Sequence, residues 1–281
     1  MLFMPGSNAR ALEKARTLAA DVLVFDLEDA VAPEMKVEAR AQVAATVRAG
    51  GYGHREIVVR VNALGTPWGR DDLTAAAQAG ADAVLLPKVE AAESVSAAIA
   101  ALGPAPAVWC MLETPRGILN APSIAAASPR VTALVIGTSD LTKDLHARHT
   151  RERVPLVTSL QLCVLAARSA GIIALDGVHL DLADDAGFAA ACRQAADFGF
   201  DGKTLIHPKQ VALANEVFAP AAADVDWARR VIAAHTEALA RGRGVVVLDG
   251  RLIENLHVDD AHRVLALTDA IAASHGGGGR P

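Results

Sequence analysis

Short apolar runs alternate with longer amphipathic segments along most of this chain. The runs have the length of buried strands, and the segments between them carry apolar residues at helical spacing. The pattern predicts eight strands, at Leu2–Met4, Val22–Asp26, Ile57–Val61, Ala83–Leu86, Val108–Leu112, Leu134–Ile136, Ile172–Asp176 and Lys203–Ile206. A helix is expected after each strand, and a longer polar loop is expected between the sixth strand and its helix.

Eight strands that alternate with eight helices are typical of a closed parallel barrel. An open doubly wound sheet is the alternative, but no Gly-x-Gly-x-x-Gly sequence opens any of the expected helices. A length of 281 residues suits one barrel with an appendage. We therefore expect an α/β protein with a (β/α)8 TIM barrel over residues 1–220 as its catalytic domain.

The pattern changes after Pro220. Val225–Arg241 predicts a long helix, the following segment predicts a hairpin that turns at Asp249-Gly250, and Val258–Ala273 predicts a last helix. This C-terminal helix–hairpin–helix cap, residues 221–275, is too small for a large core of its own. We expect it to pack on the barrel or on a neighbouring subunit. The glycine-rich residues 276–281 predict a disordered tail.

Composition narrows the function classes. The net charge of −5 and the absence of a long basic run give no reason to expect nucleic acid binding. No apolar run reaches the roughly 18 residues of a membrane span, and the first residues lack the features of a signal peptide. Cys110, Cys163 and Cys192 lie in apolar segments without metal-site spacing, so buried free thiols and a cytoplasmic location are expected.

Two carboxylates follow neighbouring strands. Glu113 comes directly after the fifth strand, and Asp140 comes shortly after the sixth. Because strand ends at one rim of a barrel supply its catalytic groups, we expect the two side chains to lie over one spot. Hard oxygen donors suit Mg²⁺, and no paired His or Cys residues favour zinc. A general acid–base pair would look the same in the sequence.

Further charged residues end other strands. Asp26, Glu28 and Asp29 cluster after the second strand, either as caps for the next helix or as site residues. Arg60 ends the third strand inside an apolar run, so it needs an anionic partner, which is a protein carboxylate or a ligand. Lys88 occupies the corresponding place after the fourth strand, where an internal ion pair is the alternative to a site role.

Two segments could hold an anion. In PGSNARALEKA, Ser7 or Asn8 caps a helix whose Arg10 and Lys14 are one turn apart, although an ordinary solvated helix face fits equally well. His207 follows the eighth strand, where barrels often bind phosphate groups. A lone His at such a place is more often structural than catalytic.

Taken together, these segments resemble a known family. The sequences LFMPGSNARALEKA, VFDLEDAVAPEMK, VVRVN, LLPKVE, MLETPRGILN, IGTSDL, DGVHLD, GKTLIHPKQ and GRLIENLH, in this order over essentially the whole chain, resemble the citrate lyase β-subunit-like branch of the HpcH/HpaI aldolase family. Within it the likeness is closest to (3S)-malyl-CoA lyases and malyl-CoA thioesterases. The resemblance implies a Mg²⁺-dependent barrel, with Mn²⁺ as an alternative ion, that acts on acyl-CoA esters. It also implies a homo-oligomer, a trimer or hexamer, whose C-terminal segment covers a neighbour's site.

The resemblance also assigns roles to residues. It implies that Glu113 and Asp140 are the metal ligands and that Arg60 contacts substrate oxygens. From their place after the second strand, we also count Asp26 and Glu28 among the catalytic candidates. The residues that fall on CoA-side positions are Phe3, Ser7, Lys14, Ser139, Ile206 and His207. Asn8 stands where the family has a CoA-binding arginine, and Arg10 is the replacement contact that we expect.

The cap segment departs from the lyase pattern. Many lyases have an aspartate where this chain has Glu254, and the following Asn-Leu-His is similar to thioesterase-like members. Glu254 would exchange a proton with the acetyl carbon in a lyase, or activate water in a thioesterase. Both reactions stay open, as do a citryl-CoA or citramalyl-CoA lyase and a citrate lyase β subunit that works in a complex. An aldolase acting on CoA-free hydroxy-oxo acids is disfavoured, because the PGS…R…K segment and the cap would then have no role.

Overall fold

The structure, a computed structural model, describes residues 1–275, and the tail expected at 276–281 lies outside this range. The chain divides into two compact units between Ala214 and Asn215.

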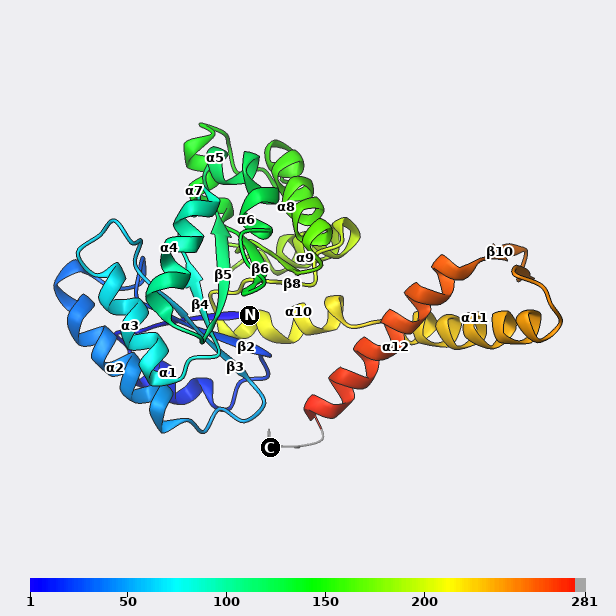
Figure 1. Ribbon diagram of the computed structural model, residues 1–281, viewed down its shortest axis with the longest axis horizontal. Helices are drawn as coiled ribbons and strands as arrows, with labels where there is room; N and C mark the ends of the chain where they lie inside the picture. Colours follow the sequence, from blue (N-terminus) through cyan, green and yellow to red (C-terminus); the bar gives the residue numbers. More distant parts are fainter. Residues whose placement is uncertain (276–281) are drawn as a thin grey trace. The chain divides into compact units, whose positions relative to one another are not determined.

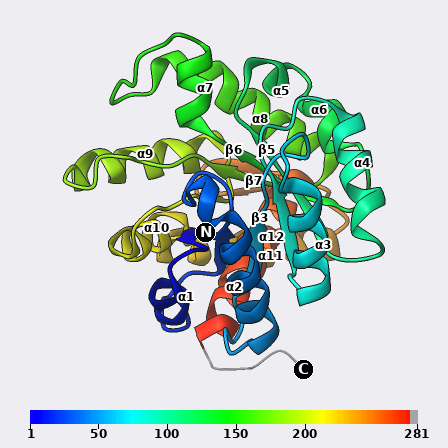
Figure 2. The ribbon, with the colours of Figure 1, turned by 90° about the vertical axis from the view of Figure 1, so that its left-hand side faces the viewer.

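Eight parallel strands form a single sheet in the first unit, and they follow chain order from β1 to β8. Their bounds are β1 (Leu2–Pro5), β2 (Val22–Asp26), β3 (Glu56–Arg60), β4 (Ala83–Leu86), β5 (Ala107–Leu112), β6 (Val131–Ile136), β7 (Ile173–Asp176) and β8 (Gly202–Lys203). Because parallel neighbours need a crossover, helices lie between successive strands, and Figure 2 shows them surrounding the sheet. The expected α/β class with eight parallel strands is confirmed.

Both ends of this sheet approach one another. Leu2 forms a parallel bridge with Leu205, and the Phe3 N–H donates to the Leu205 carbonyl at 2.9 Å. The Leu205 N–H donates in turn to the Met1 carbonyl at 2.9 Å. The eighth strand, expected to reach Ile206, is shorter, because the N–H groups of Ile206 and His207 donate to the side chain of Gln210 instead of to a strand.

Helices cover the outside of the sheet (Figure 1). The α-helices of this unit are α1 (Ala9–Ala15), α2 (Lys36–Ala49), α3 (Gly69–Ala79), α4 (Ala92–Leu102), α5 (Pro115–Leu119), α6 (Ala121–Ala125), α7 (Thr138–Asp144), α8 (Val157–Ala170) and α9 (Asp185–Phe198), and α10 (Val211–Phe218) spans its end. Short 3-10 turns are η1 (Pro33–Met35), η2 (Val154–Leu156) and η3 (Pro208–Gln210).

Two helical segments differ from expectation. The single helix expected after the fifth strand is two short ones, α5 and α6, because Asn120 leaves helical geometry and Pro122 lacks the N–H that would continue the first helix. Helix α7 lies where a polar loop was expected. Its sequence, TSDLTKD, buries only Thr138, Leu141 and Thr142, too few apolar positions to show a helical period.

Apolar side chains fill the interior of the sheet. A buried cluster takes residues from β2 to β7: Val24, Val58, Ala83, Leu85, Trp109, Met111, Ala133, Val135 and Leu175. Side chains alternate across a strand, so the residue two positions after a cluster member faces the same side. The inward rows therefore lead from Val24 to Asp26, from Val58 to Arg60 and from Met111 to Glu113, which brings polar groups to the carboxyl ends of the strands.

The second unit consists of α11 (Ala222–Ala240), a hairpin of β9 (Val246–Leu248) and β10 (Arg251–Ile253), and α12 (Asn255–His275). The hairpin turns at Asp249-Gly250, as expected, and both residues have positive φ, which such a two-residue turn requires. Ala228, Val231, Ile253 and Ala261 form a small core between the helices and the hairpin.

Two expectations from composition can be compared with this structure. Cys110, Cys163 and Cys192 are buried and free, as expected. Among residues 1–275, we find no helix whose length and apolar character would allow it to cross a membrane.

Candidate active site

The candidate site lies at the carboxyl ends of the strands. A pocket of about 370 Å³ opens there, and it is lined by residues of β1, β2, β3, β5 and β6 and of the segments that follow β2, β5, β6, β7 and β8. Among the residues singled out from the sequence, those that line it are Phe3, Asp26, Asp29, Arg60, Glu113, Ser139, Asp140 and Ile206. The structure therefore brings together side chains that are more than 200 positions apart in the chain.

Other candidates lie elsewhere. Ser7, Arg10 and Lys14 are exposed on or next to α1 and do not line the pocket, while the Asn8 side chain caps α1 by accepting from the Ala11 N–H. Glu254 is exposed in the second unit, directly before α12. It belongs to the second unit, whereas the residues that line the pocket belong to the first.

His207 has a structural contact. Its Nδ1 accepts the Lys209 N–H at 3.1 Å, and Gln210 completes a capping box at the start of η3. The imidazole therefore holds the turn after β8, which agrees with the structural alternative for this residue.

Arg60 is bound by the acids that follow β2. Its Nε and Nη2 donate to the two carboxylate oxygens of Asp26, each at 2.6 Å. Its Nη1 lies 3.0 Å from Glu28 and 3.2 Å from Asp29. Burial alone would lower the pKa of Arg60, but its hydrogen bonds to Asp26 and the charges of the neighbouring carboxylates outweigh burial and raise the pKa. The anionic partner that we expected for Arg60 is therefore a set of protein carboxylates.

The ring of Phe3 lies over this guanidinium, with 4.9 Å between the ring centroid and Cζ. Met111 contacts it from another side, with its sulfur 3.9 Å from Nη1. Met111 was not predicted from the sequence. It precedes Glu113 by two residues, and residues two apart in a strand face the same side, so this spacing could have indicated it. Val178, Leu180 and Thr204, which also line the pocket, were missed as well.

Several hydrogen bonds hold the acidic turn after β2. Asp26 accepts the N–H groups of Glu28 at 2.8 Å and Ala30 at 3.0 Å, so its carboxylate shapes the turn and does not cap the following helix. Lys36 is buried behind the turn, where its ammonium donates to the carbonyls of Leu27 and Glu28. These contacts leave Asp26 no oxygen without a partner, so it acts through Arg60 and the turn.

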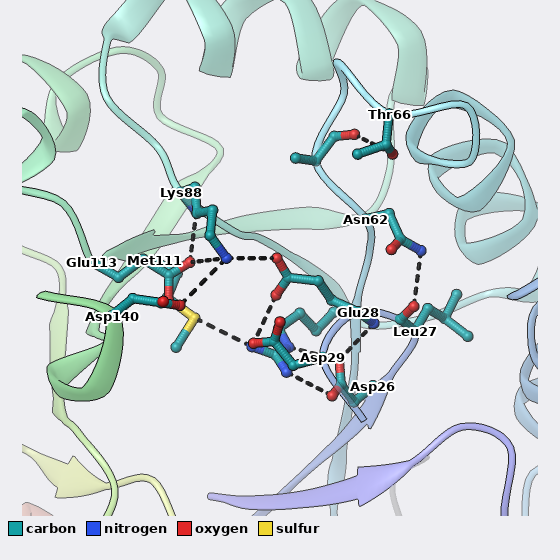
Figure 3. Close-up of polar contacts among 12 residues, drawn as sticks. Asp26, Leu27, Glu28, Asp29, Asn62, Thr66, Lys88, Met111, Glu113 and Asp140 are labelled. Carbon is teal, nitrogen blue, oxygen red and sulfur yellow. Dashed lines mark hydrogen bonds and ion pairs between the residues drawn. The ribbon is translucent and has the colours of Figure 1, made fainter. Parts of the chain in front are cut away.

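Glu113 and Asp140 converge on the other side of the pocket (Figure 3). Glu113 is 2% exposed, and burial raises its pKa to about 7 even though Lys88 and Arg60 oppose the shift. Asp140 is half-buried; burial alone would raise its pKa, but the charges of Lys88 and Lys143 lower it. Gly137 allows this arrangement, because a Cβ there would lie 2.5 Å from Oε2 of Glu113.

The donor set fits a hard cation. The Lys88 ammonium lies 3.4 Å from Asp140, 3.9 Å from Glu113 and 3.1 Å from Glu28, so a positive charge already stands among three carboxylates. Within residues 1–275 no group of three or more His, Cys, Asp or Glu side chains has the geometry of a metal site. Two carboxylates are a number with which Mg²⁺ is commonly held, the other positions going to water and substrate oxygens.

The chain is similar to known proteins. Residues 1–208 match the family described as HpcH/HpaI aldolase/citrate lyase. The chain is 50% identical to the (3S)-malyl-CoA thioesterase of Cereibacter sphaeroides strain KD131 over 97% of this chain and 95% of that protein. It is 38% identical to the citrate lyase subunit beta of Escherichia coli K12, over 95% of this chain and 91% of that one.

A solved structure is similar as well. Protein CitE from Mycobacterium tuberculosis, in complex with magnesium, acetoacetate and coenzyme A, superposes with a TM-score of 0.80 at 33% sequence identity, covering 95% of this chain and 97% of that chain. A citrate lyase beta subunit from M. tuberculosis, complexed with oxaloacetate and magnesium, has a TM-score of 0.68 at 35% sequence identity. The match covers 78% of this chain and 96% of that chain. From the match over residues 1–208 and the identity over almost its whole length, this chain belongs to the HpcH/HpaI aldolase/citrate lyase family.

Proposed function

We propose that this protein is an enzyme of acyl-CoA esters that cleaves or hydrolyses a (3S)-malyl-CoA-type substrate with the help of Mg²⁺. The observation that carries this proposal is the convergence of Glu113 and Asp140 beside Arg60 in one pocket, in a chain that is 50% identical to a (3S)-malyl-CoA thioesterase. The magnesium and coenzyme A of the similar M. tuberculosis structure support the same ligands here. Mn²⁺ is the proposed substitute ion, since it also prefers oxygen donors.

In this proposal, Glu113 and Asp140 hold the metal ion. The ion, when bound, would polarise a carbonyl or hydroxyl oxygen and stabilise negative charge that develops on it. Arg60 points a fixed guanidinium at the same pocket and binds the substrate's acidic end. Asp26 and Glu28 keep that guanidinium in place, since their carboxylates contact all three of its nitrogen atoms.

For the lyase reaction, Glu254 starts in its protonated form. The β-hydroxyl group of malyl-CoA gives its proton to water, and the bond between C2 and C3 of the acyl chain breaks. The electron pair of that bond moves to the CoA thioester as an enolate, and the oxo acid glyoxylate leaves. Glu254 then gives a proton to the enolate carbon, which yields acetyl-CoA. For hydrolysis, Glu254 instead takes a proton from water that attacks the thioester carbonyl, so that malate and free CoA form.

The remaining expectations belong to the same proposal. The sheet closes into a TIM barrel, which the bridge between Leu2 and Leu205 supports. Residues 1–220 are the catalytic domain and 221–275 a cap that covers a neighbour's site in a homotrimer or hexamer of the cytoplasm. Phe3, Ser7, Arg10, Lys14, Ser139 and the Ile206–His207 backbone contact the CoA part of the substrate.

Product analysis of the purified chain with (3S)-malyl-CoA and Mg²⁺ tests the function. Glyoxylate and acetyl-CoA would show the lyase, whereas malate and free CoA would show the thioesterase. The 38% identity to a citrate lyase beta subunit favours one other candidate, a subunit that needs an acyl-carrier partner. Such a subunit would release neither pair of products when alone, and this result would reject the proposal.

A further inference from the structure

Lys88 has an unusual backbone conformation. It follows β4 with a φ of 49°, in the left-handed region that non-glycine residues rarely adopt. In this conformation its N–H donates to Oε1 of Glu113 at 2.8 Å. The main chain therefore fixes the start of the Lys88 side chain next to the buried carboxylate, a position that a strained residue keeps only where its surroundings demand it.

Three carboxylates share the ammonium group of Lys88. It lies 3.1 Å from Glu28, 3.4 Å from Asp140 and 3.9 Å from Glu113. Figure 3 shows the Lys88 side chain reaching between these three carboxylates. The side chain is 38% exposed, whereas that of Glu113 is 2% exposed. One flexible cation thus neutralises three carboxylates, two of which are the proposed metal ligands.

A divalent ion and this ammonium cannot use the same carboxylates equally well. Mg²⁺ binds oxygen at about 2.0–2.1 Å, so an ion on Glu113 and Asp140 would lie within a few ångströms of the Lys88 nitrogen. Like charges at such a distance repel strongly where water is scarce. Ligation therefore requires the ammonium to move away.

We propose that Lys88 is a built-in counter-ion that competes with the divalent cation for Glu113 and Asp140 and swings aside when the cation binds. The inference rests on the proposed function, because it takes these two residues as metal ligands. The backbone bond from Lys88 to Glu113 can persist during the exchange, since only the side chain has to move. A cavity of about 190 Å³, lined by Asn62, Pro87, Lys88 and Ser94 among others, provides space beside the residue.

This exchange has a chemical consequence. Asp26, Glu28, Asp29, Glu113 and Asp140 surround two cations, Arg60 and Lys88. Without a cation at Glu113 and Asp140, their carboxylates would repel each other and any anionic substrate. Lys88 lowers that repulsion before the metal binds, at the expense of metal affinity, and its ammonium becomes available to the substrate afterwards.

The test compares Lys88→Met with Lys143→Met. Lys143 is the matched control because it lies 3.3 Å from the same Asp140 but contacts neither Glu113 nor Glu28, and its side chain is 70% exposed. Chelator-treated protein is titrated with Mg²⁺ and Mn²⁺ by calorimetry, and its melting temperature is measured with and without the ion. Lys88→Met should bind the ions roughly tenfold more tightly than the wild type. Its metal-free form should melt at a lower temperature, and the ion should raise its melting temperature more.

Lys143→Met should change the affinity much less. Lys88→Gly removes the ammonium while it suits the positive φ, so it repeats the test if Lys88→Met folds poorly. Lys88→Arg keeps a cation and should return the affinity towards that of the wild type. Unchanged or weaker metal binding by Lys88→Met and Lys88→Gly would overturn the inference. If the wild type itself bound neither ion, the proposed metal site would fail, and the inference with it.

Discussion

Glu113 combines two demands that oppose each other. Burial makes its ionised form costly, yet a metal ligand has to be ionised. Its pKa in the folded chain is raised above the ordinary value to about 7. The contribution of Glu113 to the free energy of unfolding is therefore fully present below its ordinary pKa. This contribution is lost as the pH rises through about 7.

Metal binding should follow the opposite trend. Because Glu113 must lose its proton to bind the ion, affinity for Mg²⁺ should increase as the pH rises towards and through about 7 and then level off. Calorimetric titrations of chelator-treated protein between about pH 6 and about pH 8 measure this dependence. Glu113→Gln, which cannot ionise, is the control and should bind the ion weakly at every pH. A constant affinity for the wild type would contradict the role of Glu113.

Gly137 is a second residue on which the site depends. In Gly137→Ala, the new Cβ would stand 2.5 Å from Oε2 of Glu113 and 2.6 Å from its Cβ, so the glutamate has to move. We expect Mg²⁺ affinity to fall by about 10- to 100-fold, the usual effect of disturbing the support of a metal ligand. Gly244→Ala is the control, since a Cβ there meets no atom within 4 Å and the residue lies outside the pocket. Equal metal affinity in the two variants would show that Glu113 is not a ligand.

At the scale of elements, the sequence predicted the strands best. Their apolar runs are continuous because both faces of a parallel sheet are covered, and each of the eight has a counterpart in the structure. The ends of segments were harder to predict. β8 was expected to reach Ile206, but the N–H groups of Ile206 and His207 donate to the side chain of Gln210, a contact that the apolar pattern does not show. Helix α7 was missed because Leu141 is the only apolar residue in it, so its buried positions, which include two threonines, give no apolar pattern.

Part of the candidate site could be predicted from the sequence, because the strands themselves could be predicted. Glu113 and Asp140 could be paired because they follow neighbouring strands, and strand order sets which ends meet. Pairing of Lys88 with both of them could not be predicted, because it depends on a backbone turn with positive φ at a non-glycine residue. The distance from Arg60 to Asp26 follows from strand register, since the two residues are partners in the β2–β3 pair.

Helix α1 carries a prediction about substrate binding. Lys14 is exposed in its last turn and does not line the pocket, so its proposed role is to bind the CoA part away from the reacting atoms. Lys14→Ala should raise KM for (3S)-malyl-CoA by about tenfold and change kcat little, the pattern of lost remote binding. Arg48→Ala removes another exposed cation, from the last turn of α2, and should alter neither constant. A fall in kcat at unchanged KM would contradict the CoA role.

At the scale of the whole molecule, the second unit exposes apolar side chains that its small core does not bury. Val247, Leu252 and Leu256 are exposed on or beside its hairpin, although only a few residues make up its core. Such a patch is typical of a surface that contacts another protein. This observation supports the proposal that the unit covers a neighbouring subunit and brings Glu254 to its site.

Co-expression of two inactive variants tests the arrangement. Asp140→Asn lacks a proposed metal ligand, and Glu254→Gln lacks the proposed proton-transfer group of the cap. If the cap acts on a neighbour, mixed oligomers should regain about a quarter of the wild-type sites, because some sites receive both intact residues. Sedimentation of the wild type should show an oligomer. A fully active monomer, or mixed oligomers without any recovery, would contradict the arrangement.

The central claim is that Glu113 and Asp140 hold a divalent ion that the reaction of a CoA ester requires. The most direct measurement is the rate of (3S)-malyl-CoA consumption while Mg²⁺ is titrated into chelator-treated wild type and Asp140→Asn. We expect the wild-type rate to appear with the added ion and the Asp140→Asn rate to be lower by roughly 10²-fold or more at saturation. Full turnover by the chelated wild type, or by Asp140→Asn after the same treatment, would contradict the account.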